Sequence, residues 1–114
     1  MEAARALADL VEISPQIEAA AVVAGGQVEG SVGVPDGRVG LLQRAVRELL
    51  DGAARVRRGE ERVTQIRAEL AGGDVFLVSG DDERTIVAVT RERTTPGLVF
   101  YDLKRCLAEI ADET

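Results

Sequence analysis

The chain has 114 residues, of which 46% are hydrophobic and 30% charged, and its formal net charge is −6. This length and composition predict one soluble globular domain over residues 1–114, and the acidic balance excludes nucleic-acid binding, which needs a dense basic surface. The sequence holds no histidine and a single cysteine, Cys106, which excludes an intrachain disulfide, His-ligated zinc and Ser-His or Cys-His nucleophile pairs.

The first part of the chain predicts a helix followed by a β-hairpin. Residues 2–13 place apolar side chains at helical spacing, and Ser14-Pro15 ends the helix because a residue before proline is pushed out of the α region. The apolar run 18–24 predicts a strand, which Gly25-Gly26 turns back into a second strand over 27–33. Glycines within this second strand weaken it, which suits the edge of a sheet.

After a turn over 34–37, the sequence predicts a long helix over 38–56. Its apolar positions are Leu41, Leu42, Ala45, Val46, Leu49, Leu50, Ala53 and Val56. This stripe is wider than contact with one sheet requires. The helix either lies deep on its own sheet or is buried on two sides, by that sheet and by a second subunit. The width of the stripe favours the second interpretation, with Arg44, Arg47, Asp51 and Arg55 on the remaining polar side.

The last part of the chain predicts three strands and a helix. Gly59 suits the end of the long helix, and an alternating strand follows over 62–70. Gly72-Gly73 indicates a second hairpin turn, and two further strands are predicted over 74–79 and 85–90. The helix expected over 96–111 has a buried stripe of Val99, Leu103, Cys106, Leu107 and Ile110.

The resulting order of elements is α-β-β-α-β-β-β-α. Hairpin connections make the sheet mostly antiparallel, and the continuously apolar strands need helices on both faces. The sequence therefore predicts an α+β fold, a three-layer α/β/α sandwich around five strands.

The sequence contains no catalytic, cofactor-binding or metal-binding motif. The glycines of the first hairpin lack the Lys-Ser or Lys-Thr and the helix start of a phosphate loop, and the acidic run 81–83 is interpreted as a solvated turn. Glu60 and Glu61 suit either an electrostatic partner contact or a solvated connection, and Cys106 an inert core position. No apolar run approaches the roughly 18 residues of a membrane span, and no signal cleavage site is evident. We therefore expect a cytoplasmic, non-enzymatic protein without membrane insertion.

Four segments, in this order, resemble the Roadblock (dynein light chain) family. They are the first hairpin, the long helix, the central hairpin and the start and apolar stripe of the last helix, at residues 19–26, 41–56, 72–78 and 96–110. The resemblance covers residues 5–111. It departs from the family at the first hairpin tip, where Gly25-Gly26-Gln27 replaces the more usual Asp-Gly turn.

The resemblance implies a five-stranded antiparallel sheet of order 2-1-5-4-3, with one helix on one face and two on the other. It also implies a homodimer formed through the long helix and the edge of the strand 62–70. The residues that it places in the dimer interface are Leu41, Leu42, Ala45, Leu49, Val63, Gln65 and Arg67.

Members of this family regulate or scaffold small Ras-like GTPases or serve as dynein light chains, and the bacterial ones include gliding-motility GTPase activators. The Ala- and Arg-rich composition suggests a bacterial protein, which favours the role of a GTPase regulator that acts on its partner. Arg44, Arg47, Arg55 and Arg58 are the partner contacts expected from their place on or after the long helix. The alternatives are a small-ligand sensor and a purely structural dimerisation domain.

Overall fold

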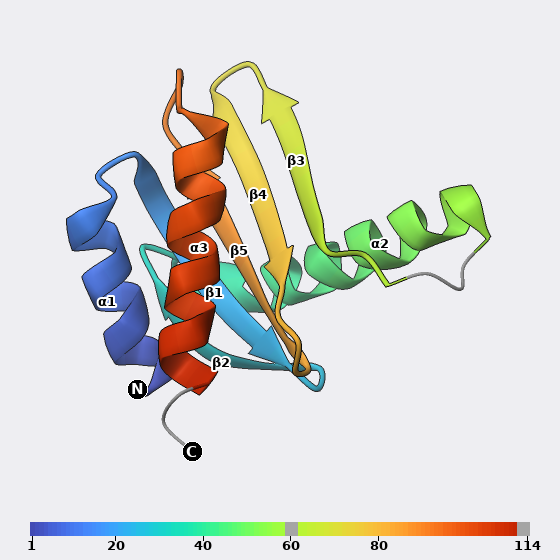
Figure 1. The fold of residues 1–114 in the computed structure, drawn as a ribbon, viewed down its shortest axis with the longest axis horizontal. Helices are drawn as coiled ribbons and strands as arrows, with labels where there is room; N and C mark the ends of the chain where they lie inside the picture. The colour runs from blue at the N-terminus through green and yellow to red at the C-terminus, as the bar shows by residue number, and fades with distance from the viewer. Residues whose placement is uncertain (59–61, 112–114) are drawn as a thin grey trace.

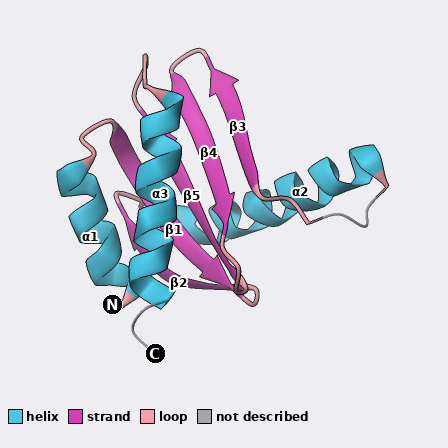
Figure 2. Cartoon of the chain, in the orientation of Figure 1, coloured by secondary structure: helices cyan, strands magenta, loops and turns pink. Residues whose placement is uncertain are grey.

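The computed structural model describes residues 1–58 and 62–111 and places three helices against a five-stranded sheet (Figures 1 and 2). The elements are α1 (Ala3–Ile13), β1 (Ile17–Ala24), β2 (Gln27–Val32), the 3-10 helix η1 (Asp36–Arg38), α2 (Val39–Arg57), β3 (Gln65–Leu70), β4 (Gly73–Ser79), β5 (Arg84–Thr90) and α3 (Pro96–Ala111). Gly59, Glu60 and Glu61, to which the sequence assigned a helix end and a charged connection, lie outside the described residues.

The strand order is β2-β1-β5-β4-β3, and every neighbouring pair is antiparallel. Helices α1 and α3 cover one face of the sheet, and α2 crosses the other face (Figure 1). The predicted fold class, strand order and distribution of helices are therefore confirmed. The prediction that the second strand forms an edge is confirmed as well, because β2 ends the sheet opposite β3.

The two faces of the sheet bury unequal cores. Under α1 and α3, sixteen of the described residues form a buried cluster centred on Phe76, Leu7 and Leu103, each at most 1% exposed. Phe100 packs its ring edge-on against Phe76, with 5.0 Å between centroids. Under α2 the buried cluster has only four of the described residues, so most of the apolar burial that stabilises the fold lies on the α1/α3 face.

One predicted strand is shorter than expected. Residues 62–64 were assigned to a strand, but β3 begins at Gln65. Its partner β4 ends at Ser79, whose N–H donates to the carbonyl oxygen of Thr64 at 2.9 Å, so the residues before Thr64 have no strand beside them. Arg62 instead donates a side-chain hydrogen bond to the carbonyl oxygen of Gly80.

The pairs Gly25-Gly26 and Gly72-Gly73 occupy different positions in their hairpins. Gly25 and Gly26 both have positive φ, at 56° and 81°, as a tight two-residue hairpin requires. The second predicted turn is shifted by one residue, because Leu70 pairs with Gly73 and the turn is formed by Ala71 and Gly72. Gly73 is a strand residue with φ 144°, and a Cβ there would collide with the carbonyl oxygen of Thr90. Glycine is needed at this position for close backbone approach.

Substituting Gly73→Ala is expected to destabilise the fold by at least about 2 kcal/mol, because the new Cβ adds both backbone strain and a collision with the neighbouring strand. Gly72→Ala is the matched control, since nothing lies within 4 Å of its Cβ position, and it should change stability by less than about 0.5 kcal/mol. Urea unfolding at one fixed protein concentration measures both. Equal stabilities for the two variants would contradict this account of Gly73.

Candidate interaction surface

Helix α2 has two apolar faces. Leu42, Val46 and Leu50 recur every four residues and pack on the sheet, where Val46 is only 3% exposed. The second face, which we call the outer stripe, consists of Leu41, Ala45, Leu49 and Val56. Its large side chains are open to solvent: Leu41 is 57% exposed and Val56 is 90% exposed. The broad apolar pattern of the sequence thus corresponds to one face packed on the sheet and one without a covering element within the described residues.

The C-terminal end of α2 projects past β3 (Figure 1). On the face of the sheet that α2 crosses, β3 presents Ile66, Ala68 and Leu70, which alternate with the residues on the opposite face. Ile66 is half-buried, whereas Leu70 is 58% exposed. Apolar side chains of the outer stripe and of β3 therefore lie uncovered on the same side of the molecule.

Strand β3 also leaves one backbone edge open. The hydrogen bond between Ser79 and Thr64 and the register from Gln65↔Val78 to Leu70↔Gly73 define which residues bond to β4. Because bonding alternates along an antiparallel pair, the even-numbered residues of β3 point their N–H and C=O groups at β4. The odd-numbered residues, Gln65, Arg67 and Glu69, direct theirs outward. Such an edge is a template for another strand.

Arg67 is held in place on the open edge. Its guanidinium makes an ion pair with Asp74 at 2.9 Å and another with Glu69 at 3.3 Å. It also lies over the ring of Phe76, 5.9 Å from the centroid. Asp74 is 6% exposed and its N–H donates to the hydroxyl of Thr90 at 3.2 Å. A fixed cation thus lies on the α3 side of β3, at the edge of the sheet that faces away from β4.

The segment that contains α2 is basic within an acidic chain. Residues 36–58 hold six arginines and three acidic residues, a net charge of +3, whereas the whole chain has −6. Arg44, Arg47 and Arg55 are exposed, and none of them takes part in the ion pairs found among the described residues. A surface of this charge attracts an acidic partner and repels basic ones.

The residues predicted as interface or partner contacts fall into separate groups. Leu41, Ala45 and Leu49 lie on the outer stripe, but Leu42 packs against its own sheet. Val63 lies before β3 begins. Gln65 and Arg67 offer their backbone groups to the open edge, while their side chains face the α3 side of the sheet. Of the four arginines, Arg47 leans toward the β1–β2 turn, with Nη2 3.3 Å from where a Cβ of Gly26 would stand, and Arg58 follows the end of α2.

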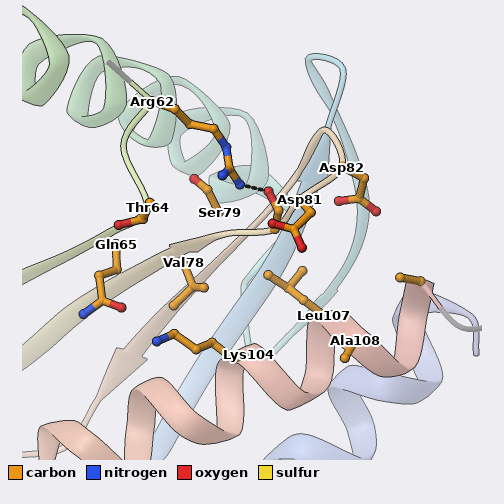
Figure 3. Close-up of a pocket in the computed structure, with 12 residues that line it drawn as sticks. Arg62, Thr64, Gln65, Val78, Ser79, Asp81, Asp82, Lys104, Leu107 and Ala108 are labelled. Atoms are coloured by element: carbon orange, nitrogen blue, oxygen red, sulfur yellow. Dashed lines mark hydrogen bonds between the residues drawn. The ribbon is translucent and has the colours of Figure 1, made fainter.

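A cleft of about 600 Å³, lined by both polar and apolar side chains, lies between α3, the start of β3 and the β4–β5 turn (Figure 3). Among the residues that line it are Arg62, Thr64, Gln65, Ser79, Asp81 and Lys104. Lys104 points into it from α3, and Arg62 crosses to the carbonyl oxygen of Gly80 (Figure 3). Sequence reasoning missed this cleft because its lining residues come from separate segments and form no motif.

The acidic run 81–83 forms the exposed turn that its sequence predicted. Asp82 accepts a hydrogen bond from the backbone N–H of Arg84 at 3.0 Å and another from Arg84 Nη1 at 2.7 Å. The backbone N–H of Arg84, which stabilises the carboxylate, lowers the pKa of Asp82 below its ordinary value. Arg84 also bonds Glu29 on β2 at 2.8 Å, so these charges brace the turn against the sheet.

An apolar groove of about 340 Å³ separates the first turns of α2 from the sheet. Ala19, Val34, Pro35, Leu41 and Val89 contribute apolar walls, and Arg38 is the one charged residue of its lining. The groove opens beside the outer stripe, with which it shares Leu41 and Ala45.

Over residues 1–58 and 62–111, no cluster of three or more His, Cys, Asp or Glu residues is placed to hold a metal ion. None of the helices in the same ranges is long and apolar enough to cross a membrane.

Comparison with known proteins gives matches among solved structures only. No family profile and no curated protein matches the sequence. A Roadblock/LC7 domain from Streptomyces avermitilis is 16% identical, with a TM-score of 0.81 over 95% of this chain and 93% of that one. The gliding protein MglB from Thermus thermophilus is 19% identical, with a TM-score of 0.71 over 99% of this chain and 90% of that one. An MglB with a tetrameric arrangement is 17% identical, with a TM-score of 0.72 over 96% and 85%. The chain has the fold of Roadblock/LC7 domains, as its sequence indicated.

The only cysteine lies inside the α1/α3 core, where it is 2% exposed. Burial raises the pKa of the Cys106 thiol to about 12, so the thiol stays protonated near neutral pH. We expect iodoacetamide at pH 8 to alkylate Cys106 at least about 100-fold more slowly in the folded protein than in urea. Similar rates in the two conditions would show that this position is accessible and would contradict its assignment to the core.

Proposed function

We propose that this protein is a homodimeric, single-domain interaction module of the cytoplasm that regulates or scaffolds a small Ras-like GTPase. The observation that carries the proposal is the outer stripe of α2 beside the open edge of β3. Exposed apolar area of this kind marks a surface that is covered by a partner. The same two elements are those through which the Roadblock family, which the sequence resembles, forms its dimers.

A second copy of the chain suits this surface because its β3 can pair with the open strand edge and its apolar side chains can cover the outer stripe. An antiparallel β3 from the second copy bonds the outward N–H and C=O groups of Gln65, Arg67 and Glu69. A two-fold axis perpendicular to the sheet keeps both α2 helices on one face, so that each outer stripe meets the other chain. The interface is isologous and closes at two subunits.

A GTPase partner is supported by charge and by fold. The paired α2 helices would present two sets of exposed arginines, of which Arg44 and Arg55 lie outside every ion pair found among the described residues. This basic surface suits an acidic face of a partner. The shared fold with a gliding protein, MglB, supports the gliding-motility GTPase branch of the family over the dynein branch.

The proposed role is regulation of chemistry that the partner performs. The chain has no histidine and its one thiol is buried and protonated, so the side chains that most often serve as a general base near neutral pH are absent or blocked. Any stimulation of hydrolysis would therefore come from positioning the GTPase's own residues, or from an arginine that completes the partner's site.

The apolar groove supports a second candidate, a small-ligand sensor. A volume of about 340 Å³ suits a small apolar molecule, and Arg38 at the lining suits a carboxylate on it. A ligand that raises the melting temperature of the isolated protein would support this role. A purely structural dimer would show neither such stabilisation nor a GTPase partner.

Substituting Leu49→Glu should convert the dimer to a folded monomer, because it puts a charge into the centre of the outer stripe. Leu98→Glu is the matched control, since Leu98 is an exposed leucine on α3, at the other face of the sheet, and is 57% exposed against 38% for Leu49. Sedimentation velocity measures the mass of each variant. A wild-type protein that remains monomeric at high micromolar concentration, or a Leu49→Glu variant that stays dimeric, would overturn the proposed interface.

The tagged protein should capture a small GTPase from native lysate in the presence of a GTP analogue, and much less of it with GDP. Arg44→Glu should weaken binding to the captured GTPase roughly tenfold because it reverses a charge beside the outer stripe. Arg5→Glu on α1, an exposed arginine on the opposite face, is the control and should bind as the wild type does. Recovery of no GTPase in either nucleotide state would favour the ligand sensor or the structural dimer.

A further inference from the structure

The open edge of β3 restricts how two copies of this chain can pair. Only Gln65, Arg67 and Glu69 direct backbone groups outward, so an antiparallel second strand must set its own odd-numbered residues opposite these. The two-fold axis then lies where one residue of β3 faces the same residue of the second copy. Few registers meet this condition, and they differ in which charged and apolar side chains of β3 they place opposite each other.

The charges on β3 distinguish these registers. An axis through Arg67 sets two arginines opposite each other, and an axis through Glu69 does the same with two glutamates; like charges in directly opposed positions are destabilising. An axis through Ile66 leaves the exposed Leu70 beyond the paired strands. An axis through Ala68 sets Arg67 of each copy opposite Glu69 of the other, which makes two pairs of opposite charge.

We propose that two copies join their β3 strands antiparallel about a two-fold axis at Ala68, with Arg67 of each copy facing Glu69 of the other. This inference rests on the proposed homodimer and specifies its contact residue by residue. It makes the sheet of the dimer continuous through ten strands.

The surroundings of Arg67 suit this pairing on the α3 side of the sheet. Asp74 and the ring of Phe76 hold its guanidinium on the edge, where its side chain remains 35% exposed. The side chain of Glu69 is 76% exposed and is free to face a second cation. The Glu69 carboxylate of the second copy meets an Arg67 guanidinium that Asp74 and Phe76 of the first copy already hold in place.

The opposite side of the sheet is consistent with the same axis. There the register sets Ile66 of each copy against Leu70 of the other, which covers the side chain that is 58% exposed in one chain. Ala68 faces its own counterpart at the axis, on the side of the sheet where Ile66 and Val75 pack under α2. A small residue at this point leaves room for the two helices above the joined strands.

Single cysteines in β3 test the register, with Cys106 left in place because it is buried. At the axis, two Ala68→Cys residues form a non-hydrogen-bonded pair with Cα atoms about 4.5 Å apart, within reach of a disulfide. Two Ile66→Cys residues are about 14 Å apart in this register, which is too far. We therefore expect diamide to cross-link Ala68→Cys to a covalent dimer and to leave Ile66→Cys uncross-linked. An equal mixture of Ile66→Cys and Leu70→Cys proteins should cross-link.

The results distinguish an error in the proposed register from an error in the proposed homodimer. Sedimentation of the wild type and of the reduced variants shows whether the dimer exists and whether each variant keeps it. The register is wrong and the homodimer remains if the dimer exists but Ile66→Cys cross-links in the absence of Leu70→Cys. The same conclusion follows if the dimer exists and no cysteine in β3 cross-links. If the wild type is a monomer, the homodimer fails and the register fails with it.

A charge reversal gives a second readout that needs no cross-link. Glu69→Lys should raise the dissociation constant of the dimer roughly tenfold, because each copy then sets a cation against Arg67 of the other. Glu92→Lys, an exposed glutamate between β5 and α3, is the matched control and should leave the dissociation constant unchanged. Equal dissociation constants for the two variants would overturn the pairing of Arg67 with Glu69.

Discussion

The length of α2 relative to the sheet beneath it is the constraint on which the surface of this protein depends. Nineteen residues of α-helix extend about 28 Å, whereas five strands span roughly 19 Å from the first to the last. A helix that crosses the strands must therefore project beyond one edge, and it projects past β3 (Figure 1). Val56, near the projecting end, is 90% exposed, with no covering element among the residues that the structure describes.

The two faces of the sheet differ in how much apolar surface they bury. The large cluster under α1 and α3 gives the subunit its stability. Few of the described residues are buried under α2, so the proposed dimer would add apolar contact on the face where the single chain has least. In the proposed dimer, assembly through this face would depend on the position of α2.

Much of this fold could be predicted from the sequence because its signals are local. Gly25-Gly26 marks a two-residue turn, and the apolar stripe of α3 follows one face of a helix. The excess width of the α2 pattern indicated a second apolar face, which is exposed in the structure, and its burial by a second subunit stays a prediction. The details that could not be predicted depend on contacts between distant segments. The glycine at position 73 is needed because of Thr90, and β3 starts at Gln65 because β4 ends at Ser79. Leu42 and Leu41 are adjacent in the chain, and only the packing separates the sheet side from the outer side.

Amide hydrogen exchange in β3, followed residue by residue, tests most directly whether a second copy covers this edge. The N–H groups of Ile66 and Ala68 bond to β4 and should be protected at every protein concentration. The N–H groups of Arg67 and Glu69 point outward, so our account predicts that they are protected at high concentration and lose protection on dilution. Rapid exchange of Arg67 and Glu69 at all concentrations would contradict it, because the edge of β3 would then be open in solution.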